Sequence, residues 1–228
     1  MKQKLVCAFL LLISSVCTWA QQHYTSNIAL GVKGGTTISK QMFSPSVEQS
    51  FLVGYMGGIT FRYIEEKHFG LIAELNLEQR GWKETFDNTQ FTFNRTLTYL
   101  QIPFLAHVYF GSDKFKFFFN AGPEMGILIN EKTNANYDIH NIANIPDFPL
   151  KNRYTEQQTM PLNSKFDYGI SAGLGMEWQQ NKRNSFLLEG RFYYGLNNIF
   201  SAHKRDTFAA SNGISIPVSY THLTLPTN

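Results

Sequence analysis

Histidine side chains are the first candidates for chemistry, because an imidazole can bind a metal ion or act as a general base. The chain has six: His23, His68, His107, His140, His203 and His222. Their spacing does not match that of a metal-ligand motif. The pair Gly173 and Gly175 has neither the third glycine nor the following helix of a dinucleotide-binding turn. The sequence therefore predicts no metal site and no cofactor.

One histidine has acidic neighbours that could orient it as a catalytic base. His140 lies close in the sequence to Asp138 and Asp147, within the polar segment 131–165. Some barrel enzymes hydrolyse lipid or peptide with serine, histidine and acidic groups at the barrel rim. We expect a solvated loop histidine and no enzymatic activity here, and an outer-membrane hydrolase is kept as an alternative.

The polar residues that remain belong to a period-two pattern, which is typical of β-strands. Eight strands are expected, at 24–35, 51–63, 69–81, 97–110, 115–130, 166–179, 185–197 and from 213 onwards. At roughly 10–15 residues they are longer than the common soluble strand, and a tilted strand needs about 9–11 to cross hydrocarbon. No apolar run after residue 20 is long enough for a transmembrane helix.

The charges within these strands all fall on the face opposite the apolar one. They are Lys33, Arg62, Glu74, Glu78, Arg80, Lys116, Glu124, Asp167, Glu177, Glu189 and Arg191. A basic residue facing lipid costs about 2–4 kcal/mol at the bilayer midplane, so this exclusion indicates that lipid covers the apolar face. We expect the inward charges to form a structural salt-bridge network that fills a narrow lumen.

Connection lengths support the same architecture. The connections 64–68, 111–114 and 180–184 are short, and they alternate with the long connections 39–50, 83–96, 131–165 and 198–212. Short turns on one side and long loops on the other are typical of outer-membrane barrels. The predicted fold is all-β, an eight-stranded antiparallel up-and-down transmembrane β-barrel whose long loops face outward.

Aromatic residues gather on the apolar face at the short-turn end of the expected strands. The predicted aromatic girdle consists of Phe61, Tyr63, Phe69, Phe110, Phe115, Phe117, Trp178 and Phe186. Aromatic rings are favoured at the boundary between membrane and water, so the girdle marks one surface of the bilayer.

Residues 1–20 have the features of a secretory signal peptide, with a basic start, a short apolar run and a small residue at Ala20. The barrel domain would then be 21–228. Both cysteines lie in the expected signal, which leaves no disulfide or thiolate site. Removal of Lys2 and Lys4 lowers the net charge from +3 to +1, so the sequence gives no reason to expect a nucleic-acid partner.

Several short motifs are similar to those of PorT-like outer-membrane β-barrel proteins. They are Gly31-Val32-Lys33-Gly34-Gly35, Tyr99-Leu100-Gln101-Ile102-Pro103-Phe104, Ala121-Gly122-Pro123, Asp167-Tyr168-Gly169 with Gly173 and Gly175, and Glu189, Arg191, Tyr193 and Gly195. The resemblance covers nearly all of the expected mature chain. It implies an eight-stranded outer-membrane barrel, and it links the founding member of the family to a protein secretion system.

The C-terminal segment departs from that family pattern. Such barrels usually end on an aromatic residue, whereas this chain continues through Ser219 and Pro226 to Asn228. We expect residues 219–228 not to be native and the natural last strand to be truncated.

The sequence thus predicts a non-enzymatic outer-membrane protein with a structural, adhesive or secretion-accessory role. Its expected partners are outer-membrane lipid and, through the long loops, other envelope or secretion proteins. An exported, soluble, lipocalin-like ligand-binding barrel is the other alternative. That alternative requires an apolar interior and a polar exterior.

Overall fold

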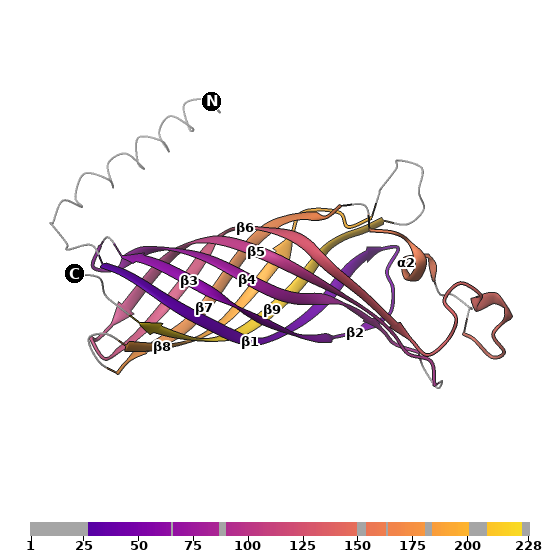
Figure 1. Cartoon of the computed structure of the whole chain (residues 1–228), viewed down its shortest axis with the longest axis horizontal. Coiled ribbons are helices and arrows are strands. Elements are labelled where there is room, and N and C mark those ends of the chain that lie inside the picture. The colour runs from indigo at the N-terminus through magenta and orange to yellow at the C-terminus, as the bar shows by residue number, and fades with distance from the viewer. Residues whose placement is uncertain are drawn as a thin grey trace, which may run out of the picture.

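A computed structural model describes residues 27–64, 66–86, 90–149, 154–162, 164–180 and 184–200, and the backbone of 209–224. The chain forms a closed antiparallel barrel whose strands are strongly tilted (Figure 1). This confirms the predicted fold class. The expected signal peptide at 1–20 lies outside the described residues, and its prediction stays untested.

Eight long strands make the barrel wall: β1 (Asn27–Ser44), β3 (Leu52–Ile64), β4 (Phe69–Glu84), β5 (Phe93–Gly111), β6 (Phe115–Ala135), β7 (Phe166–Gln179), β8 (Asn184–Gly195) and β9 (Ala209–Thr224). Each pairs with its neighbours in the chain, and β9 pairs with β1 to close the barrel. The two-residue strand β2 (Gln49–Ser50) adds to β4 at the rim. Among the described residues the helical segments are η2 (Ile142–Asn144) and α2 (Glu156–Thr159), both in the connection between β6 and β7. No helix among the described residues is long and apolar enough to cross a membrane.

Several strands extend further at the long-loop end than the sequence predicted. Segments 39–44, 93–96, 131–135 and 209–212, which we assigned to connections, belong to β1, β5, β6 and β9. In β5 the outward residues change from apolar Leu100 to polar Thr98, Thr96 and Asn94, while Phe93 and Leu97 are buried inside. The pattern inverts because water, and no longer lipid, faces this part of the wall. The loss of the apolar outer face is why the prediction ended these strands early.

Inward glycines let large interior side chains approach the wall. A Cβ atom on Gly169 would lie 2.7 Å from the Tyr193 ring, and one on Gly175 would collide with the ring of Phe118. Both rings are buried inside the barrel. The glycines therefore determine where the bulky groups of the lumen can lie.

The C-terminal strand takes part in the ladder along most of its length. β9 pairs with β1 from Ala209 to Thr224 and with β8 from Ile214 to Thr224. The part of the segment 219–228 that the structure describes therefore helps to close the barrel. Its predicted non-native origin and the predicted truncation are untested.

Candidate functional site

The wall separates an apolar exterior from a charged interior. Leu75, Phe104 and Ile170 point outward, with 40%, 49% and 54% of their surface exposed, whereas Glu74 and Arg191 are only 6% and 3% exposed. An exposed apolar surface that runs around a closed barrel is what a lipid environment requires. A lipocalin-like soluble barrel would have the opposite arrangement.

The charges that the sequence placed on the inner face lie in the lumen. All of them are buried except Lys116, which is partly exposed near the short turns, with its ammonium group 5.2 Å from the Tyr109 ring centre. The outward aromatic residues of the predicted girdle lie at the same end. Phe61, Phe110, Phe115, Phe117 and Trp178 are exposed, whereas Tyr63, Phe69 and Phe186 are partly buried.

The centre of the lumen holds two cations and two carboxylates in one cluster. Arg191 donates to both oxygens of Glu74, at 2.8 and 2.9 Å, and also to both oxygens of Glu189, at 3.0 and 2.8 Å. Lys33 donates to Glu74 at 3.0 Å and lies 3.8 Å from Glu189. Because the charges balance and each carboxylate accepts several hydrogen bonds, this central cluster offsets its own desolvation.

A second interior group surrounds Arg80. Its guanidinium lies 3.2 Å from Asp167, and its central carbon lies 4.4 and 4.2 Å from the ring centres of Tyr99 and Tyr193. The Tyr193 hydroxyl donates to Asp167 at 2.7 Å. Such cation–π and hydrogen-bond contacts fix the arginine in place and leave little room for a solute.

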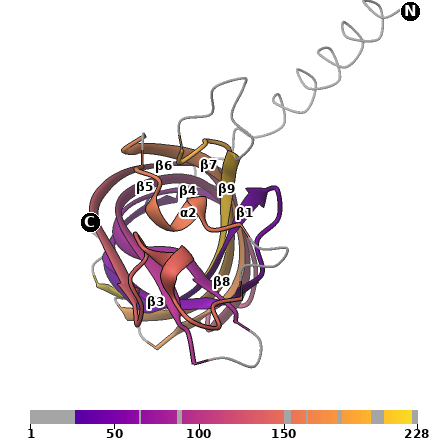
Figure 2. The same cartoon turned by 90° about the vertical axis from the view of Figure 1, so that its right-hand side faces the viewer.

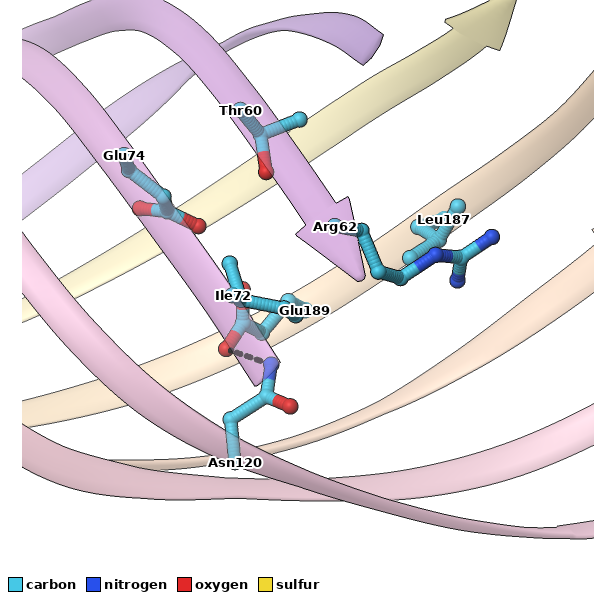
Figure 3. A pocket seen from close by; sticks show the side chains of 7 residues that line it. All are labelled: Thr60, Arg62, Ile72, Glu74, Asn120, Leu187 and Glu189. Carbon is cyan, nitrogen blue, oxygen red and sulfur yellow. Dashed lines mark hydrogen bonds between the residues drawn. The ribbon is translucent and has the colours of Figure 1, made fainter. Parts of the chain in front are cut away.

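A water-sized cavity lies beside the central cluster (Figure 3). The cavity is about 10 Å³ and is lined by Thr60, Arg62, Ile72, Glu74, Asn120, Leu187 and Glu189. Asn120 donates to Glu189 across it at 2.8 Å. Arg62 makes a two-point contact with Glu177, at 2.8 and 3.0 Å. A cavity of this size holds about one water molecule.

An apolar cluster closes the lumen at the short-turn end. Ile64, Tyr109, Phe118 and Leu187 pack together there, and the fully buried His107 stacks on Tyr109 with 5.2 Å between ring centres. The sequence analysis missed this short-turn cluster because it treated the inner face as polar. Strict alternation would have found Phe118, which lies between the outward residues Phe117 and Phe119.

A larger aromatic cluster covers the opposite mouth. This long-loop cap consists of Trp82, Phe86, Phe93, Leu97, Tyr99, Ile142, Phe148, Ile199 and Phe200. Six of these nine residues lie in segments that the sequence analysis assigned to the long connections 83–96, 131–165 and 198–212. These residues lie outside the eight period-two segments from which the strands were predicted, so the sequence analysis did not assign them to a core.

Buried polar contacts fasten the connection between β6 and β7 into the mouth. Gln157 and Gln158 of α2 donate to the two oxygens of Glu84, at 2.9 and 2.6 Å. Arg95 donates to the carbonyl oxygens of Gln157 and Met160, at 3.1 and 2.8 Å. In Figure 2 α2 lies within the outline of the barrel. This part of the longest loop is therefore an ordered plug.

Among the described residues, no carboxylate is hydrogen-bonded to the ring of the candidate catalytic histidine. His140 is exposed, and the Asp138 carboxylate accepts a hydrogen bond from the backbone N–H of His140, at 2.9 Å, and not from its ring. His23 and His203 lie outside the described residues, as does the side chain of His222. Among the described side chains no group of histidine, cysteine and acidic residues could hold a metal ion.

Comparison with known proteins agrees with this architecture. The family model of the outer membrane protein beta-barrel domain matches residues 19–201. The chain belongs to this family. It is accordingly an outer-membrane protein. The alternative of a soluble lipocalin-like barrel is therefore wrong, because a soluble barrel would not reside in the membrane. No curated protein sequence matches the chain.

Three solved structures with a similar fold are distant from this chain in sequence. Neisserial surface protein A has 10% identity and a TM-score of 0.46, over 86% of this chain and 96% of its own. OprG from Pseudomonas aeruginosa has 10% identity and a TM-score of 0.47, over 86% and 95%. Outer Membrane Protein W of E. coli has 14% identity and a TM-score of 0.41, over 86% and 97%.

Proposed function

We propose that this outer-membrane barrel is non-enzymatic and holds an ordered loop surface in place for another envelope or secretion protein. The filled lumen carries this proposal: an apolar cluster closes each end and ion pairs occupy the middle. A lumen filled in this way does not conduct solutes. The long loops, fastened into the mouth, offer a fixed surface that a partner can bind without first ordering it.

The motifs that resemble PorT-like barrels support a secretion-accessory role over an adhesive one. Lys33, Glu189 and Arg191 belong to the central cluster, and Asp167 and Tyr193 belong to the group around Arg80. Part of the resemblance therefore lies in residues that fill the lumen. A PorT-like protein with this interior acts through its loops and its membrane position.

The proposal includes an orientation. We propose that residues 1–20 are a cleaved signal peptide, so that β1 starts from the periplasmic side. The short turns then face the periplasm, and the long-loop cap faces outward.

Two measurements on the full chain test the proposed function. In planar bilayers the purified protein should give no steady conductance, while a general porin in the same bilayer conducts.

In intact cells, p-benzoylphenylalanine at position 154, on the loop surface, should crosslink to a discrete envelope protein after irradiation. The matched control places the same group at position 75, on the lipid face, where only lipid adducts are expected. Stable channels, or the same protein adducts from both positions, would overturn the proposal.

A further inference from the structure

One strand of the barrel continues well beyond its neighbour. Ile127 of β6 pairs with Phe166, the first residue of β7, but β6 runs on to Ala135. The next contact on that side is the Leu128 N–H, which donates to the carbonyl of Lys165 at 2.6 Å. From 130 to 135, β6 pairs with β5 alone among the described strands, and Ile129 lies at a register shift. Residues 129–135, which we call the β6 edge, have no strand partner on their other side among the described residues.

The long-loop cap does not cover the β6 edge. Arg95 and Leu97 of β5 are buried, whereas their cross-strand partners, Thr133 and Glu131, are exposed. Every residue from 129 to 135 is exposed, on both faces of the strand. The cap therefore stops at β5.

The register shows which backbone groups point outward from the edge. The Asn136 N–H donates to the carbonyl of Thr92 at 3.3 Å, so the even-numbered residues of this segment direct their backbone groups toward β5. By alternation, the N–H and C=O groups of Glu131, Thr133 and Ala135 point away from β5. A row of such groups recognises an extended polypeptide, which can add as a further strand.

Side chains hold the β6 edge in a fixed shape. Asn134 donates to the side chain of Asn94 at 3.1 Å, and Asn136 donates to the carbonyl of Gln90 at 2.6 Å. On the inner face Glu131 accepts a hydrogen bond from Arg95 at 2.6 Å. Because the edge is already ordered, the conformational entropy lost on binding is mainly that of the partner strand.

Charge specifies the residue that should face the edge. Lys132 lies on the outer face, where its neighbours Thr96, Asn130 and Asn134 are uncharged. A carboxylate on an added strand would give this lysine a cross-strand partner.

Two copies of this chain inserted the same way would present β6 edges that run in the same direction relative to the membrane. They could not form the antiparallel pairing that the barrel uses throughout.

We propose that the β6 edge binds an extended segment of a partner polypeptide as an added antiparallel strand, with an acidic side chain near Lys132. The proposal rests on the proposed function, since it names how the partner would be held. Unlike the proposed function, strand addition at the β6 edge depends on backbone geometry, so it can be tested without the natural partner.

The test uses the full chain refolded in detergent micelles and a capped synthetic peptide of alternating threonine and valine with a central glutamate. Amide hydrogen exchange is followed by nuclear magnetic resonance. Exchange at Glu131, Thr133 and Ala135 should slow about tenfold at saturating peptide, as expected for newly formed hydrogen bonds. The amides of Lys132 and Asn134, which already face β5, should not change. A peptide with central lysine should bind about two- to fivefold more weakly.

Two chemical controls keep the result specific. A peptide N-methylated on its bonding side should give no protection. Thr133→Pro removes one outward N–H and should still fold, with its heat-modifiable gel shift retained, but lose peptide binding, whereas Thr133→Val keeps both folding and binding. Unchanged exchange in the folded protein, equal protection by the N-methylated peptide, or binding retained in Thr133→Pro would each overturn the edge proposal. None of these results depends on conductance, which tests the proposed function separately.

Discussion

The central cluster of the lumen gives the sharpest test of the interior, because its charges balance only as a set. Glu74 accepts two hydrogen bonds from Arg191, one from Asn76 and an ion pair from Lys33. Replacement by leucine in Glu74→Leu would leave Lys33 and Arg191 to share Glu189 alone. One buried positive charge would then be uncompensated.

Loss of one partner from a buried ion pair costs about 3–5 kcal/mol, so we expect Glu74→Leu to lower the free energy of unfolding by that amount. The double variant Lys33→Met/Glu74→Leu restores the balance with Arg191 and Glu189. It should recover more than half of the loss, because a balanced pair replaced by apolar groups is often neutral. The coupling between the two sites should exceed about 1 kcal/mol.

The assay is urea unfolding of the protein in phospholipid vesicles, followed by tryptophan fluorescence and by the heat-modifiable gel shift. Glu66→Leu is the matched control, because it makes the same chemical change at an exposed turn, and it should alter stability by less than about 0.5 kcal/mol. If Glu74→Leu is no more destabilising than this control, or if the double variant is worse than the single one, the balanced-cluster reasoning fails.

Three further predictions concern the lipid face, the short-turn cluster and the plug. Leu75→Arg should destabilise the barrel in vesicles by about 2–4 kcal/mol, because it places a charge in lipid, while Leu75→Val should cost much less. Phe118→Ala should cost about 3–5 kcal/mol in urea unfolding by leaving a cavity, and clearly more than the lipid-facing Phe119→Ala. Glu84→Leu should raise limited proteolysis of segment 136–165 about tenfold by removing the acceptors of Gln157 and Gln158, with barrel unfolding unchanged.

Each of these outcomes can go the other way. Equal stability of the arginine and valine variants at position 75 would argue against lipid contact there. Equal costs at 118 and 119 would mean that the short-turn cluster is not packed. A proteolysis rate unaffected by Glu84→Leu would show that other contacts hold the plug in the mouth.

The sequence alone determined the wall of the barrel. Lipid acts on each outward position separately, because a charged side chain there is costly. Segment 69–77 shows the result, since its outward positions are all uncharged. The same reasoning placed Glu74 and Arg191 on the inner face without any knowledge of their contacts. Both residues are buried in the structure.

Only the tertiary structure decided which inward groups meet. Arg62 reaches Glu177 and Arg191 reaches Glu74 across the lumen, over separations of 115 and 117 residues. Closure of the sheet creates these contacts, and no local pattern encodes which two positions face each other across a barrel.

The two ends of the lumen also had to come from the structure. At the long-loop end water replaces lipid outside the wall, so the alternation inverts and Phe93 and Leu97 turn inward beneath loop residues such as Phe148 and Phe200. The open edge of β6 follows from strand lengths and register alone. Those depend on where each neighbouring strand stops, which is a property of the assembled sheet and not of any single segment.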